Sequence, residues 1–151
     1  MDDQSDAIDC GDLPTSSIPS WATLPDNDQV CLVQIRTRSS LGSDVPATEY
    51  DKECVYPLSS GKAFYIGRHS GERCIVVDHV TVSRRHALLV HKGNTLYLRD
   101  HSSNGSFIND RQVGKTRFFP VRIGDILRFG ENSLRFVLHN NVAEHDRSEE
   151  R

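Results

Sequence analysis

The sequence predicts an all-β fold of the sandwich or barrel type. Short apolar segments rich in β-branched and aromatic residues recur along most of the chain, and residues that favour tight turns separate them. No segment repeats its apolar residues with the 3.6-residue period of an amphipathic helix. Many short strands joined by glycine and asparagine turns are typical of a β-sandwich or a closed barrel.

The expected strands follow one another at short spacing, and two pairs of them form hairpins. Gly93-Asn94 joins one pair, because both residues tolerate positive φ, and Gly130-Glu131-Asn132 joins another. In the last strand, Leu134, Phe136 and Leu138 share one face, so this face is expected to meet the core. The expected strands are residues 30–35, 62–66, 74–77, 87–90, 95–98, 126–129 and 134–138.

Polar segments flank and interrupt the β-rich region. Residues 1–28 carry Asp, Ser and Pro with little periodicity, which predicts a disordered N-terminal arm. Trp21 is the exception in this arm, and the sequence leaves open whether it docks on the domain or stays solvated. We expect residues 29–140 to form one domain and residues 141–151 to form a charged C-terminal tail. Residues 39–53 are expected to form a long polar loop, whose role the sequence leaves open.

The composition argues against several classes of protein. A net charge of -3 gives no bulk electrostatic support for binding nucleic acid or an anionic membrane. No apolar run approaches the roughly 20 residues of a membrane span, and the acidic N-terminus lacks the features of a signal peptide. The four cysteines and scattered histidines match no zinc pattern. We therefore expect an intracellular protein without a metal or other cofactor.

Three polar clusters lie between the expected strands. They supply arginine cations, small hydroxyls and a side-chain amide, but no convincing nucleophile and no metal cage. This set of groups suits the recognition of a phosphorylated group on a peptide better than it suits catalysis. The clusters are Ile66-Gly67-Arg68, Ser83-Arg84-Arg85-His86 and Asp100-His101-Ser102-Ser103-Asn104-Gly105-Ser106.

Each residue type in the first two clusters has a distinct chemical use. Gly67 permits a sharp turn after a strand, and Arg68 then presents a planar fork of donors that matches phosphate oxygens. Ser83 offers a hydroxyl donor, and Arg84 adds a second cation beside it. His86 begins an apolar run, so we interpret it as a buried histidine that braces the loop through hydrogen bonds.

The third cluster contains a tight-turn dipeptide, Asn104-Gly105. A plain hairpin turn would explain that dipeptide, but it would not explain the density of hydroxyls just before it. An asparagine amide on such a loop can bond both the N–H and the C=O of an extended peptide. This cluster is therefore a second source of peptide contacts.

Taken in order, these motifs resemble the signature of the forkhead-associated (FHA) domain. The resemblance covers roughly residues 29–140, and Asp125, which follows Gly124 at the start of a late strand, also fits it. The resemblance implies an eleven-stranded β-sandwich whose loops at one end bind phosphothreonine peptides. The motifs that carry it are Gly67-Arg68, Ser83-x-x-His86 and Asn104-Gly105-Ser106.

The resemblance also implies a role for each matching residue. Arg68 and Ser83 would hold the phosphate, and Arg84 would contact the phosphopeptide. Asn104 would bond the peptide main chain, and Thr81 lies where some members read the third residue beyond the phosphothreonine. Ser103 matches a residue near the phosphothreonine. The residues that would support the structure of the site are Gly67, His86, Gly105 and Ser106. Ser106 stands where threonine is commoner in the family.

A narrower similarity links residues 100–107 and Val113-Gly114-Lys115 to the FHA module at the N-terminus of checkpoint and meiotic effector kinases. It implies a nuclear protein that binds a phosphothreonine-containing partner in DNA-damage checkpoint or cell-cycle signalling. The chain has no kinase catalytic-loop motif, so we expect no enzyme activity from these 151 residues. The sequence does not show whether they belong to a longer kinase.

Two alternatives stay open. One is a structural or oligomerising sandwich whose phosphate pocket is idle and takes no phosphopeptide from a partner. In this case phosphorylation of the arm, for example at Thr15 or Thr23, could make the binding intermolecular. The other is a hydrolase that uses Ser83 and His86. The hydrolase reading is weak, because residues three apart in a turn need not face each other and an aspartate would have to complete the triad.

Overall fold

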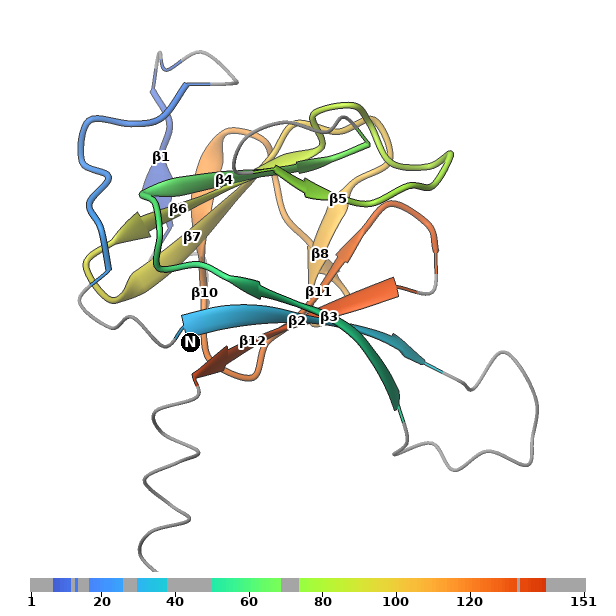
Figure 1. The fold of residues 1–151 in the computed structure, drawn as a ribbon. Coiled ribbons are helices and arrows are strands. Elements are labelled where there is room, and N and C mark those ends of the chain that lie inside the picture. The colour runs from blue at the N-terminus through green and yellow to red at the C-terminus, as the bar shows by residue number, and fades with distance from the viewer. Residues whose placement is uncertain are drawn as a thin grey trace, which may run out of the picture.

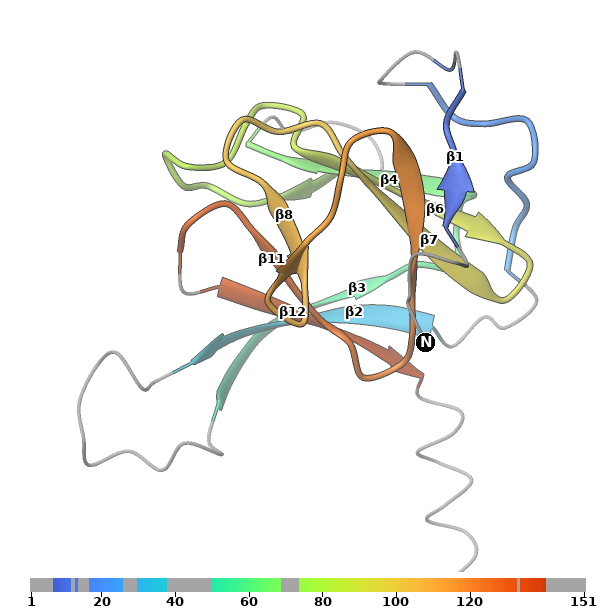
Figure 2. The ribbon, with the colours of Figure 1, turned by 180° about the vertical axis from the view of Figure 1, so that it is seen from behind.

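The computed structural model describes residues 7–11, 13, 17–25, 30–37, 50–68, 74–132 and 134–140. These residues form strands and connections without a helix, and the strands build two sheets packed face to face (Figures 1 and 2). The all-β sandwich predicted from the sequence is confirmed, with twelve strands in the described ranges instead of eleven. No helix that could cross a membrane occurs among the residues described.

Each sheet contains six strands, and neighbouring strands run antiparallel except for the parallel pair β4 and β5. The first sheet has the order β1 (Ile8–Asp9), β10 (Arg117–Val121), β7 (Thr95–Asp100), β6 (Ala87–Lys92), β4 (Ala63–Gly67), β5 (Cys74–Val76). The second has the order β3 (Tyr50–Pro57), β2 (Val30–Thr37), β12 (Leu134–Asn140), β11 (Ile126–Phe129), β8 (Ser106–Ile108), β9 (Arg111–Gln112).

All the expected strands are present, and the structure adds β3 and the short strands β1, β8, β9 and β10. The expected loop over residues 39–53 is wrong at its end, because β3 begins at Tyr50 and pairs with β2. Residues 38–49 lie outside the described residues. Pro120 makes β10 hard to predict, but β1 pairs only with Arg117 and Phe118, so no ladder on that side needs an N–H from Pro120.

Apolar side chains from both sheets fill the space between them. Phe129 of β11 and Phe136 of β12 lie with ring centroids 5.6 Å apart, and both are buried. Phe64, Ile66, Leu89 and Leu98 complete this core from the first sheet. In β12 the residues Leu134, Phe136 and Leu138 face inward, as the alternation predicts.

The outer face of the first sheet is also apolar, and a segment from the N-terminus covers part of it. In β6, five consecutive residues from Ala87 to His91 are buried, so this strand is covered on both faces. Trp21 packs edge-on against Tyr97 at 5.5 Å and against Phe118 at 5.1 Å between ring centroids. We call residues 7–11, 13 and 17–25 the N-terminal strap.

Hydrogen bonds fix the strap to the sheet as well. β1 pairs with β10, the N–H of Thr23 donates to His91 O at 2.9 Å, and the N–H of Gly93 donates to Thr23 Oγ1 at 2.6 Å. Arg99 donates from Nη2 to Leu13 O at 3.3 Å. The expected disordered arm is therefore wrong for the strap residues, because they bury apolar side chains against a sheet face that would otherwise meet water.

Candidate functional site

Loops from both sheets meet at one end of the sandwich, toward the right of Figure 1. The N–H of Arg68, just after β4, donates to Ser83 O at 3.0 Å. The N–H of Ser103, after β7, donates to Ser83 Oγ at 3.3 Å, and Asn104 Nδ2 donates to Thr81 O at 2.8 Å. These bonds bring together the polar clusters that the sequence analysis singled out.

Gly67 sets how closely β4 approaches the loop that carries Ser83. A Cβ at Gly67 would lie 2.0 Å from Arg84 O and 3.0 Å from Ser83 O, which are both backbone atoms. Such a distance is impossible for any side chain, so glycine is required here for packing and not for its φ angle. The close approach places Arg68 directly beside Ser83.

His86 braces the site from behind and is fully buried. Its Nδ1 accepts the N–H of Ser83 at 3.0 Å, so Nε2 carries the proton and donates to Gly105 O at 2.8 Å. Burial lowers the pKa of His86, which keeps the imidazole neutral as these two bonds require. The ring thereby joins the loop of Ser83 to the turn at Gly105.

This geometry contradicts a hydrolase built on Ser83 and His86. The bond to the imidazole comes from the backbone N–H of Ser83, while its hydroxyl oxygen accepts the N–H of Ser103. Both ring nitrogens are already committed, so His86 cannot act as a general base toward Ser83 Oγ. Among the described residues, no group of three His, Cys, Asp or Glu could hold a metal ion.

Asp100 organises the turn that carries Ser103 and Asn104, a role that the sequence analysis did not assign. Its Oδ1 accepts the N–H of Ser102 at 3.1 Å, Ser102 Oγ at 2.6 Å and Ser106 Oγ at 2.7 Å, and all three residues are buried. Ser102 Oγ also accepts the N–H of Gly105 at 2.7 Å. The Asp-x-Ser spacing is a signal for such a side-chain-to-backbone turn.

Thr81 joins the loop before β6 to the turn between β11 and β12. Its Oγ1 accepts the N–H of Glu131 at 2.9 Å and lies 2.9 Å from His79 Nδ1. Gly130 makes this contact possible, because a Cβ there would lie 2.7 Å from Thr81 O. The sequence assigned Thr81 to reading the peptide, but its hydroxyl is already used to hold these two segments together.

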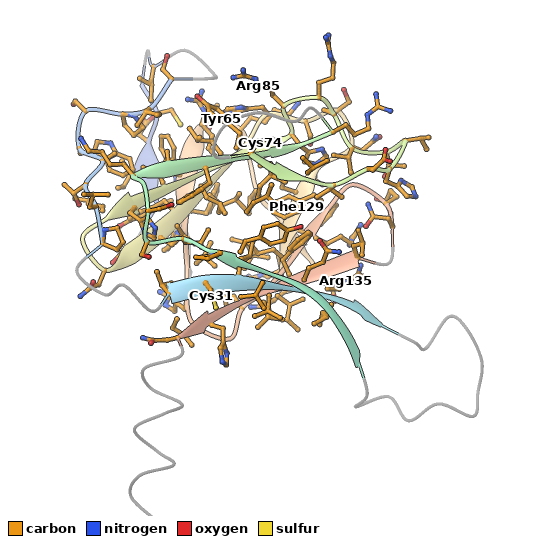
Figure 3. The ribbon with its side chains drawn as sticks, viewed as in Figure 1. Cys31, Tyr65, Cys74, Arg85, Phe129 and Arg135 are labelled. Carbon is orange, nitrogen blue, oxygen red and sulfur yellow. The ribbon has the colours of Figure 1, made fainter. Side chains whose placement is uncertain are left out.

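Three exposed arginines near the loop end, Arg68, Arg84 and Arg85, lie on two different surfaces. Arg68 and Arg84 are exposed at the loop end. Arg85 instead lies over the ring of Tyr65, 4.7 Å from its centroid, on the outer side of the first sheet (Figure 3). Thus the two arginines that the resemblance assigned to the phosphopeptide, Arg68 and Arg84, are exposed at the loop end, whereas Arg85 lies on another face.

Comparison with known proteins identifies the domain. Residues 64–130 match the FHA domain, and the solution structure of the FHA domain of TbPar42 is similar, with 26% identity and a TM-score of 0.59 over 83% of this chain and 64% of that one. These residues form an FHA domain. The match begins inside β4, so the strap and β2 to β3 lie outside it.

One curated relative and one further solved structure define how far the likeness extends. Smad nuclear-interacting protein 1 of Mus musculus is 29% identical over 105 residues, which are 58% of this chain but 27% of that protein. The MEK1 FHA domain in complex with the HOP1 pThr318 peptide is 18% identical, with a TM-score of 0.53 over 75% of this chain and 97% of that one. The likeness to MEK1 shows the fold alone.

Proposed function

We propose that the loop end of this FHA domain binds a phosphothreonine in a partner protein. The observation that carries the proposal is the convergence of Arg68 and Ser83 with the Ser103-Asn104 turn at one end of the sandwich, held by backbone and side-chain hydrogen bonds. Arg84 follows Ser83 and is exposed. The fold supports it, since the structurally similar MEK1 FHA domain is seen with a phosphothreonine peptide.

In this proposal Arg68, Ser83 and Arg84 hold the phosphate. The hydroxyl of Ser83 accepts a hydrogen bond from Ser103, so its own proton is available for a phosphate oxygen. A phosphothreonine carries about -1.5 to -2 charges at neutral pH. Each charge-assisted hydrogen bond contributes roughly 1.5–3 kcal/mol, so these three side chains supply most of the ~8 kcal/mol of a micromolar complex.

Asn104 would supply the contact to the peptide main chain, with Ser103 beside the phosphothreonine. Its amide nitrogen donates to Thr81 O, which orients the amide, and its carbonyl oxygen can then accept a peptide N–H. Thr81 would act by holding the rim of the site, together with Gly67, His86, Gly105 and Ser106, which support the loops.

A buried methyl group contributes only ~0.8 kcal/mol, so the γ-methyl of phosphothreonine alone selects threonine over serine weakly.

The test is a titration of oriented peptide libraries that contain phosphothreonine, phosphoserine or the unphosphorylated residue. We expect binding to the phosphothreonine set and its loss in Arg68→Ala. Arg122→Ala is the matched control, because Arg122 is an exposed arginine between β10 and β11, away from the loop end. Binding that Arg68→Ala retains would refute the assigned role of Arg68.

We propose a nuclear setting for this chain, which the name of the mouse relative supports. A role in checkpoint or cell-cycle signalling stays a prediction. For self-association through the arm, Thr23 is already held by the N–H of Gly93, so its phosphorylation would first have to release that bond. Thr15 lies outside the described residues.

A further inference from the structure

A hollow lies away from the loop end, between the N-terminal strap and β4. It has a volume of about 510 Å³. Ile18 and Leu24 of the strap border it, and Ala63 and Tyr65 of β4 form its wall together with Lys62. The side chains of Ile18 and Leu24 are 48% and 54% exposed, so two large apolar groups face water at the border of this hollow.

The hollow continues the apolar face that the strap covers only in part. Tyr65 of β4 pairs with Leu88 of β6 and with Cys74 of β5, so these residues form one row across the outer face of the sheet. Leu88 is fully buried, but Tyr65 and Cys74 toward the sheet edge are only half-buried. Figure 3 shows Tyr65, Cys74 and Arg85 together on this side.

The charges at the hollow have one sign. Lys62 lines it, and the guanidinium of Arg85 lies over the ring of its Tyr65. None of the described residues that line the hollow is acidic. A carboxylate on a bound segment would therefore meet a cation at Lys62 or at Arg85. A large apolar side chain on the same segment would be buried against Ile18 and Leu24.

We propose that this hollow is a docking site for an acidic segment of a partner protein that carries aliphatic or aromatic anchor residues. A second copy of this chain fits it poorly, because a two-fold contact between two such hollows would bring Lys62 and Arg85 toward their own equivalents. The site does not depend on phosphate binding. Because Arg84 and Arg85 are adjacent, one partner chain can reach both surfaces.

The experiment uses a phage-displayed library of random twelve-residue peptides without phosphorylation, selected on the full chain. Selected peptides are then synthesised, and their affinities are measured by fluorescence anisotropy. We expect enrichment of Asp or Glu together with Leu, Ile, Phe or Trp. Leu24→Ser should weaken binding roughly ten- to hundredfold, as expected for one buried leucine side chain, and Lys62→Glu should weaken it through charge reversal.

Two controls separate this site from the loop end. Ile123→Ser removes an equally exposed side chain, 53% exposed between β10 and β11, and should leave the affinity unchanged. Arg68→Ala should also bind the selected peptides normally, although it loses phosphothreonine peptides. The proposal is overturned if no acidic, apolar peptides are enriched, if Leu24→Ser and Lys62→Glu bind them as tightly as the wild type does, or if Arg68→Ala loses them. Thermal unfolding of Leu24→Ser checks that the strap stays in place.

Discussion

Replacing His86 with alanine tests whether this residue shapes the phosphopeptide site through the fold. The side chain is fully buried, and its two ring nitrogens bond Ser83 N and Gly105 O at 3.0 and 2.8 Å. Alanine removes both bonds and the edge-to-face contact with Phe129, whose ring centroid lies 5.9 Å away. The N–H of Ser83 is then left without its partner, and Gly105 O keeps only the N–H of Gly130, which donates to it at 2.9 Å.

The size of the effect follows from those two groups. The unsatisfied N–H of Ser83 costs about 1–3 kcal/mol, and the lost bond to Gly105 O, which keeps the N–H of Gly130, costs about 0.5–1.5 kcal/mol. Together they predict a loss of about 1.5–4.5 kcal/mol of unfolding free energy. That loss is a large part of the roughly 5–15 kcal/mol of a typical domain. Affinity for phosphothreonine peptide should fall as well, because the loop of Ser83 and the turn at Gly105 lose their common anchor.

Urea unfolding gives the free energy of each variant, and calorimetric titration of a phosphothreonine peptide gives its affinity. His91→Ala is the matched control: His91 is also buried, and its Nε2 contacts Leu58 O at 2.6 Å, but it lies in β6 near the strap. We expect both variants to lose stability and only His86→Ala to lose affinity. A His86→Ala protein of normal stability that cannot bind would refute this reasoning and give His86 a direct role in the site.

Three further outcomes follow from the same geometry. Gly67→Ala should lower stability by about 1–3 kcal/mol or more and abolish phosphopeptide binding, since the added Cβ would lie 2.0 Å from Arg84 O; urea unfolding and calorimetry measure both. Thr81→Val should speed amide exchange at Glu131, whose N–H it bonds, and cost about 1 kcal/mol. Burial lowers the pKa of His86, His91 and His101, and that of His101 falls to about 4. The folded state therefore binds fewer protons than the unfolded state between these pKa values and the unperturbed value of about 6.5. The free energy of unfolding should consequently fall as the pH drops from about 6.5 toward 4.

The strands that the sequence predicts well are those that carry their own signal. β2, β4, β6 and β7 are runs of β-branched, aromatic and leucine residues, and their turns contain glycine or asparagine. β8 and β9 are three and two residues long, so they have no alternation to detect. Their pairing comes from neighbours, since β8 pairs with β11 and β9 pairs with β8.

The site residues divide in a similar way. Arg68, Ser83 and Asn104 stand in short local motifs, so a resemblance can point to them. The contacts that hold these loops together do not follow from a local motif. Thr81 and Glu131 are 50 residues apart, and no local pattern links a threonine in one loop to a backbone N–H in another. Asp100 is intermediate, because its spacing to Ser102 predicts a turn but not the bond to Ser106.

The docking of the strap is indicated less by its own residues than by the strand that it covers. Trp21 alone leaves docking undecided, but β6 offers a second signal, because Ala87, Leu88, Leu89 and Val90 have no polar residue among them. A strand with one wet face alternates, whereas an unbroken apolar run requires a cover on both faces. One cover is the second sheet, and the other is the strap, which lies outside the matched residues 64–130. The strap supplies that cover but leaves Tyr65 half-buried, which is why the docking surface proposed here lies at its border.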